Sequence, residues 1–367
     1  MEPWIKRFDT YRRTNAFSSL DGLRCLSIVA VIWHHAGANA DSWHFFQFGF
    51  LGVELFFVIS GFLIVTLLLR ERDLTGAISL RKFYGRRALR IFPLYYAVIL
   101  SVAFFCAYAT ADSQFGTRFI DDLPYYLTYT ANFVPVVFAI VWSLATEEQF
   151  YLFWSAVEKA FQKRIVIVLA ALILANQFVN FPEGRAAIAA AIGNSEWTKL
   201  SFFHVTFTPI LLGVVAAHLL HSERGFRLLR FVVANRLAPV FWLVVLIATI
   251  STAPGDISGL PRLAIHVCMT LLVVSCVWQD NHVLKRLLTL GPVQRIGRIS
   301  YGMYLVHIFA INGAKSILDG AQSEGAMAVF FFSFIVTVII AELSFRYFES
   351  PFLEIKRRYS VVRQAHM

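Results

Sequence analysis

Long apolar runs recur along most of this 367-residue chain, and they constrain its fold more than any other feature. Each run holds roughly the 20 residues that a helix needs to cross about 30 Å of hydrocarbon. Hydrophobic residues make up 58% of the chain and charged residues only 15%, a balance that a water-soluble domain of this size does not keep in solution. We therefore expect an all-α, polytopic membrane helix bundle of about ten transmembrane helices. The predicted spans are 20–36, 50–69, 91–110, 137–157, 165–181, 200–220, 238–252, 263–279, 299–317 and 326–348.

The basic residues predict how these spans are oriented. Of the 33 Lys and Arg residues, 27 lie in the N-terminal segment, in alternate connections and at the C-terminal end. This is the positive-inside pattern for an even number of spans, so both termini are expected in the cytoplasm. The connections 37–49 and 111–136 are then expected on the external side. The formal charge of +10 follows from topology, and no nucleic-acid partner is expected.

The same pattern predicts the domain organisation. We expect a cytoplasmic N-terminal segment at 1–19, a transmembrane domain at 20–353 and a basic cytoplasmic tail at 354–367. The first apolar run contains Asp21 and Arg24, so we expect it to remain as a span and not to be cleaved as a signal peptide. The four cysteines lie in apolar runs without metal-ligand spacing, and no metal site is expected.

An ionisable side chain inside a span costs roughly 3 kcal/mol, so each one is a candidate functional residue. In the first span, Arg24 and His35 are 11 residues apart, which is about 20° more than three helical turns and a rise of about 16 Å. Both therefore lie on one helix face, Arg24 near the cytoplasmic end and His35 near the external end. Asp21 is placed to pair with Arg24. The alternative is that Arg24 extends to lipid phosphates and that His35 only caps a helix end.

Glu54 is a carboxylate in the outer half of the second span, at the expected depth of His35. A carboxylate beside an imidazole fixes its tautomer and raises its basicity, as a general base requires. We therefore expect Glu54 to orient His35. The alternative is an interfacial carboxylate in contact with water.

The third and fourth spans carry two further charged pairs. Arg87 and Arg90 lie one turn apart at the cytoplasmic boundary, where two guanidiniums suit phosphate binding, although such residues often only set topology. Glu147 and Glu148 are expected near the bilayer centre, where at least one must face a polar interior.

Several other polar residues in the spans have no decisive partner in the sequence. Those that are equally consistent with a structural or a catalytic role are Tyr301, Tyr304, His307 and Glu342. Those expected to be structural are His204, His218 and His266.

At these residues the chain resembles the acyltransferase 3 family of bacterial membrane proteins, in order from Leu20 to about Leu353. The family's pattern of Arg, ten residues and His matches Arg24 and His35. Its second block resembles GFLGVELFFVISGFLI, with Glu54 where members commonly have Asp.

Later blocks extend the resemblance. The family's Arg pair falls on Arg87 and Arg90, and its pattern of Ser, Leu, two residues and Glu favours Glu147 over Glu148. The terminal blocks resemble RISYGMYLVH and ELSFRYFESPF, whereas spans five to eight match only in hydropathy.

The resemblance implies an acyl-CoA-dependent O-acyltransferase of the bacterial inner membrane. It would move an acyl group, usually acetyl and possibly succinyl, from cytoplasmic acyl-CoA to a hydroxyl of a cell-envelope or exported polysaccharide, such as lipopolysaccharide or exopolysaccharide. Membrane lipid, the acyl-CoA donor co-substrate and a glycan or lipid-linked saccharide are the expected partners. The expected catalytic residues are His35, Glu54 and Glu147, and the expected donor-binding residues are Arg24, Arg87 and Arg90. Some members carry an additional extracytoplasmic hydrolase-like domain, which this chain is expected to lack.

Two other classes of protein fit part of the pattern. In a transporter or flippase of an anionic or glycan-linked lipid, the arginines would hold phosphate and His35 would relay protons. A non-catalytic membrane scaffold would not explain why His35 and Glu54 are both expected at one depth. Coenzyme A binding by the purified protein separates the enzyme from both alternatives.

Overall fold

The computed structural model describes residues 3–14, 16–37, 44–192, 206–255, 257–318 and 325–359, and every regular element in these ranges is a helix. The predicted all-α class is therefore confirmed. A helix lies at each of the ten predicted spans. Five of these helices are individually long and apolar enough to cross a membrane, and up to seven spans result if two bent helix pairs each count as one. Ten spans and the orientation of the termini remain predictions.

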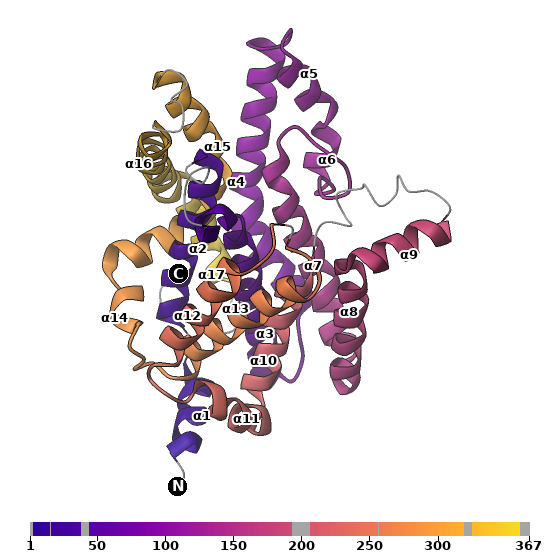
Figure 1. The fold of residues 1–367 in the computed structure, drawn as a ribbon, viewed down its shortest axis with the longest axis vertical. Helices are drawn as coiled ribbons and strands as arrows, with labels where there is room; N and C mark the ends of the chain where they lie inside the picture. Colours follow the sequence, from indigo (N-terminus) through magenta and orange to yellow (C-terminus); the bar gives the residue numbers. More distant parts are fainter. Residues whose placement is uncertain are drawn as a thin grey trace. The chain divides into compact units, whose positions relative to one another are not determined.

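The chain folds into two compact units, which are described one at a time. Unit 1 comprises residues 1–76, 208–345 and 361–367. Its longer helices are α2 (Ser18–Ala36), α3 (Leu51–Thr75), α10 (Thr208–His221), α12 (Ala238–Ser251), α13 (Gly259–Trp278), α15 (Gly291–Ile317) and α16 (Ala326–Ser344). Its shorter helices are α1 (Pro3–Arg13), η1 (His44–Phe48), α11 (Glu223–Val233) and α14 (Lys285–Leu288). In this unit α3 packs against α10 and α2, and α15 packs against both α2 and α16 (Figure 1).

Glycines allow the closest helix approach in unit 1, between α3 and α10. A Cβ atom added at Gly61 would lie 2.1 Å from the carbonyl oxygen of Ile210, and one added at Gly213 would lie 2.3 Å from that of Val58. Helices in a membrane gain little from hydrophobic association, so small residues that allow close backbone packing hold them together. This contact fixes α3, which carries Glu54.

The N-terminal segment is folded onto the end of α3. Arg70 is 6% exposed, and its guanidinium donates to the backbone carbonyls of Tyr11 and Thr14. Arg12 also pairs with Asp73 at 2.7 Å. Polar contacts thus tie α1 and the link to α2 to the basic end of α3.

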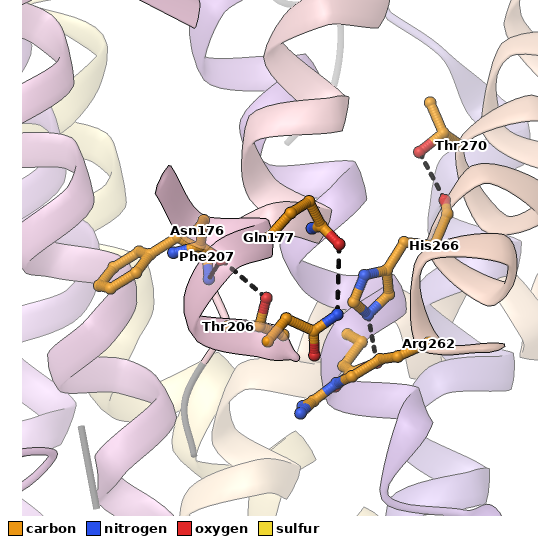
Figure 2. Close-up of polar contacts among 9 residues, drawn as sticks. Asn176, Gln177, Thr206, Phe207, Arg262, His266 and Thr270 are labelled. Carbon is orange, nitrogen blue, oxygen red and sulfur yellow. Dashed lines mark hydrogen bonds and ion pairs between the residues drawn. The ribbon is translucent and has the colours of Figure 1, made fainter. Parts of the chain in front are cut away.

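Unit 2 comprises residues 77–207 and 346–360. Its helices are α4 (Leu80–Tyr108), α5 (Gln114–Asp121), α6 (Leu123–Leu127), α7 (Trp142–Ala160), α8 (Ile165–Asn180), α9 (Pro182–Ile192) and α17 (Ser350–Arg357). The Ser79 side chain accepts a hydrogen bond from the backbone of Lys82 and so caps the start of α4. Helices α5, α6 and α17 all pack against α4. Thr206, the first residue of the described range 206–255, donates to Asn176 of α8 at 2.9 Å (Figure 2).

The connection between α4 and α7 is more than the external loop that the sequence predicts at 111–136. The Tyr95 hydroxyl donates to the carbonyl of Tyr126 at 2.9 Å, and the Tyr96 hydroxyl donates to that of Leu127 at 3.1 Å. Tyr95 and Tyr96 lie in the middle of the 29-residue helix α4. The chain therefore turns back after α5, and α6 packs beside the middle of α4. This arrangement is not evident from the amino-acid sequence, because the segment is polar enough to be interpreted as a loop.

Candidate active site

His35 lies in the last turn of α2, at the opposite end of that helix from Arg24. The helix ends at Gly37, whose φ of 79° is a left-handed conformation that glycine adopts without strain. Nδ1 of His35 lies 2.9 Å from the carbonyl oxygen of Val31. Because a carbonyl oxygen only accepts, Nδ1 carries the ring proton and donates it. In the neutral ring, Nε2 then carries the lone pair that a general base uses.

A second imidazole lies beside His35. The ring centroid of His307, on α15, is 5.0 Å from that of His35. His307 is 0% exposed, and its Nδ1 donates to the carbonyl of Tyr304 at 2.6 Å. Its Nε2 is buried and has no hydrogen-bond partner within the described residues. The sequence left the role of His307 open, and the structure places it next to the predicted catalytic histidine.

Glu54 has other partners than the one predicted from the sequence. Its carboxylate lies in the first turn of α3 and is 3% exposed. Oε2 lies 2.6 Å from Nε2 of His266, and Oε1 accepts two hydrogen bonds from Arg262, one of them from Nε at 3.1 Å. Among the described residues, the partners of the His35 ring are Val31 and two neighbouring histidines, and Glu54 is not one of them. The expected pairing of Glu54 with His35 is therefore wrong.

Both true partners of Glu54 belong to α13 (Figure 2). Figure 2 shows Arg262 and His266 on successive turns of this helix, with Thr270 donating to the backbone carbonyl of His266 at 2.8 Å. Arg262 and His266 are 208 and 212 residues from Glu54 in the chain. Arg262 lies just before the predicted span 263–279, and the sequence showed no partner for His266, which was expected to be structural; the structure gives both residues the same partner, Glu54. The Arg–Glu–His cluster joins α3 to α13.

The predicted pairing at the start of α2 is confirmed. Nη1 of Arg24 lies 3.0 Å from Oδ1 of Asp21, and Arg298 of α15 approaches the other carboxylate oxygen at 3.4 Å. A second ion pair joins α15 to α16, where Arg295 binds Glu342 with two contacts of 2.7 Å. Such bidentate geometry indicates a structural role for Glu342.

Arg87, in unit 2, is engaged within the protein. Its guanidinium lies 3.4 Å from a carboxylate oxygen of Glu148, 3.9 Å from one of Glu147, and 4.0 Å above the Tyr151 ring. These carboxylates balance the charge of the Arg87 guanidinium within the protein. Arg90 is half-buried one turn further along α4.

The two glutamates have different partners. Glu147 accepts a hydrogen bond from the Tyr151 hydroxyl, whereas Glu148 makes the shorter contact with Arg87. Unit 2 has a cavity of about 320 Å³ between α4, α7 and the turned-back segment. A cavity of this size can hold a small organic group. Its lining includes Tyr84, Arg87, Phe92, Tyr129, Glu148 and Tyr151.

No cluster of three or more His, Cys, Asp or Glu side chains suited to a metal ion occurs in the ranges that the structure describes. All four cysteines are buried and unbridged.

The chain is similar to several proteins named as O-acetyltransferases. The peptidoglycan O-acetyltransferase OatA of Listeria monocytogenes is 26% identical over 95% of this chain and 57% of its own length. A putative O-acetyltransferase of Staphylococcus aureus is 27% identical over 95% of this chain and 59% of its own length. A putative peptidoglycan O-acetyltransferase of Bacillus subtilis, YrhL, is 29% identical over 90% of this chain and 54% of its own length. The chain thus spans less than 60% of the length of each of these relatives.

No solved structure matches the chain significantly. The family profile described as an acyltransferase domain matches residues 17–344. This range includes His35, His307, the Arg–Glu–His cluster and Arg87 with its two carboxylates. This chain therefore belongs to the acyltransferase 3 family.

Proposed function

We propose that this protein is a membrane O-acyltransferase that moves an acyl group, most simply acetyl, from cytoplasmic acyl-CoA to a hydroxyl of a cell-envelope glycan. Membership of the acyltransferase 3 family supports the reaction class. The relatives named as peptidoglycan O-acetyltransferases support acetyl as the acyl group and a peptidoglycan-type saccharide as the acceptor. The apolar helices and the family support a multi-pass membrane protein, and the membrane that we propose is the bacterial cytoplasmic one.

The observation that carries the proposal is the tautomer of His35. Its Nδ1 proton is held by the Val31 carbonyl, so the neutral ring presents a basic Nε2. A general base of this kind typically raises a rate by 10²–10⁴-fold. The Val31 carbonyl supplies the orientation that the sequence attributed to Glu54.

In the proposed reaction, Nε2 of His35 accepts the proton of the acceptor hydroxyl while the oxygen attacks the thioester carbonyl carbon. A C–O bond forms and the C–S bond breaks. The coenzyme A thiolate then takes the proton back from the imidazolium, so the histidine is restored and the charge balances. The same atoms would also permit a two-step path through an acyl-histidine.

Arg24 and His35 lie on one helix, separated by a rise of about 16 Å. A pantetheine arm is long and thin enough to cover such a distance. We propose Arg24, in unit 1, and Arg90, in unit 2, each as a residue that binds phosphate of the donor on the cytoplasmic side. Arg87 would act on the donor only indirectly, since its charge is already balanced by Glu147 and Glu148.

The remaining predicted catalytic residues take supporting roles in this proposal. Glu54 positions α3 against α13 through Arg262 and His266. Glu147 holds the hydroxyl of Tyr151, whose ring stacks on Arg87. Both would affect transfer by keeping helices in place.

The test uses the purified protein in lipid nanodiscs with labelled acetyl-CoA and soluble peptidoglycan fragments as the acceptor. We expect label on the saccharide and free coenzyme A in equal amounts, with a smaller yield from succinyl-CoA. Coenzyme A binding without transfer to any envelope glycan would contradict the proposed reaction. Movement of a lipid-linked saccharide across proteoliposomes without acyl transfer would favour the flippase alternative.

A further inference from the structure

The imidazole of His307 differs from an ordinary buried histidine. His307 lies on α15 and is 0% exposed, and its Nδ1 donates a hydrogen bond to the Tyr304 carbonyl. Nε2 is therefore a hydrogen-bond acceptor in the neutral ring, and it has no donor within the described residues. Buried polar atoms in native proteins are nearly always paired, so an unpaired one calls for an explanation.

The surroundings of His307 supply that explanation. Its ring centroid lies 5.0 Å from that of His35, with an angle of 66° between the rings. The Tyr304 ring packs at 5.4 Å on the same helix. The ring that carries the unpaired acceptor thus packs directly against the ring of the proposed general base, near the place where the reacting groups of both substrates would meet.

We propose that Nε2 of His307 accepts a hydrogen bond from an N–H or O–H group of a substrate, next to the atoms that react at His35. This inference rests on the proposed acyl transfer. It makes His307 a substrate-contacting residue that fixes the position of the reacting group, while His35 moves the proton.

Two substrate groups have the required chemistry. The amide N–H of the pantetheine arm lies two methylene groups from the thioester sulfur, and a hydroxyl neighbouring the attacking one lies on the next carbon of the sugar. The complete burial of His307, in contrast to the half-buried His35, favours the pantetheine amide, because a long thin arm reaches an enclosed side chain more readily than a bulky saccharide does.

The experiment compares His307→Leu with His307→Gln in nanodiscs, with matched protein amounts. Leucine fills a similar apolar volume and removes the acceptor, whereas the glutamine amide oxygen restores an acceptor close to the position of Nε2. We expect His307→Leu to lower kcat/KM for acyl transfer by about 10- to 100-fold and His307→Gln to recover most of the loss. Leu305→Ala is the packing control, since Leu305 is also 0% exposed on α15.

Two substrate analogues then identify the donor group. One replaces the pantetheine amide nearest the thioester with an ester, and the other lacks the hydroxyl next to the acceptor position. The analogue that lacks the bonded group should slow the parent protein by about the same factor as His307→Leu, and should slow His307→Leu no further.

The outcomes separate this inference from the proposed function. Suppose that the parent protein transfers acyl groups. The inference is then wrong, although the proposed reaction stands, if kcat/KM of His307→Leu equals that of Leu305→Ala. It is also wrong if both analogues slow His307→Leu as much as they slow the parent protein. If the parent protein transfers no acyl group, the proposed function itself is wrong.

Discussion

The carboxylate of Glu54 lies 2.6 Å from Nε2 of His266, and its other oxygen binds Arg262. Three charged or polar side chains from two helices therefore meet in a nearly dry site at the first turn of α3. Removing one partner of a buried ion pair leaves the other without compensation, and this is costly. We therefore expect Glu54 to contribute mainly to the stability of the fold and only secondarily to catalysis.

Glu54→Gln should lower the free energy of unfolding by roughly 3 kcal/mol, because Arg262 loses its counter-charge. Thermal unfolding in nanodiscs measures this change, and transfer per folded molecule should stay within several-fold of the parent. Glu54→Asp is the matched control, since it keeps the charge on a shorter side chain. A Glu54→Gln variant as stable as the parent, yet as inactive as His35→Ala, would show that Glu54 acts directly on His35.

Arg87 and Arg90 should behave differently, although they lie one turn apart on α4. Arg87→Ala should destabilise the protein by roughly 2 kcal/mol, since it leaves Glu148 unpaired. Adding Glu148→Gln should recover part of that loss, which a double-mutant cycle on thermal unfolding measures.

Arg90→Ala should instead weaken coenzyme A binding by about 1.5–3 kcal/mol, the value of a lost charged hydrogen bond, with little change in unfolding. Calorimetric titration of coenzyme A into each variant checks this separation. Weaker binding in Arg87→Ala at unchanged stability would assign the phosphate contact to Arg87 after all.

The connection between α4 and α7 gives a test of topology. With the native cysteines replaced, a cysteine at Ser113 should react with a membrane-impermeant maleimide added outside intact cells, because Ser113 caps the start of α5 beyond the end of α4. A cysteine at Ala131, which is 1% exposed in the turned-back segment, should stay protected.

Labelling of Ser113 only after permeabilisation would reverse the predicted topology. Labelling at both sites from outside would mean that the whole connection is an external loop. Ser42, in the other external connection, lies outside the described residues and is a less suitable probe.

Local signals in the sequence predicted the helices well. Each of the ten apolar runs coincides with a helix, and helical spacing paired Asp21 with Arg24. These features depend on residues a few positions apart. The partners of Glu54 depend instead on how α3 packs against α13, and nothing near Glu54 in the chain encodes Arg262 or His266.

Depth in the membrane was also a poor guide to contact. The sequence predicts Glu54 and His35 at one depth, which suggests that they meet. Equal depth does not place two side chains on facing helix surfaces, and His35 meets His307 of α15 instead. The turned-back segment beside Tyr95 was missed for a similar reason, since its pairing with α4 is made by hydroxyl-to-backbone bonds that leave no periodic pattern.

The most direct test of the proposed general base is acyl transfer by His35→Ala, measured with labelled acetyl-CoA at matched membrane abundance. Loss of Nε2 should lower transfer by about 10²–10⁴-fold while coenzyme A binding and unfolding stay near the parent values. His34→Ala is the control, because it removes a neighbouring ring that packs on Phe50 and on the edge of His35 but leaves the contact of His35 with Val31 in place. Near-normal transfer by His35→Ala, or loss of transfer in His34→Ala with normal transfer in His35→Ala, would contradict the assignment of His35 as the general base.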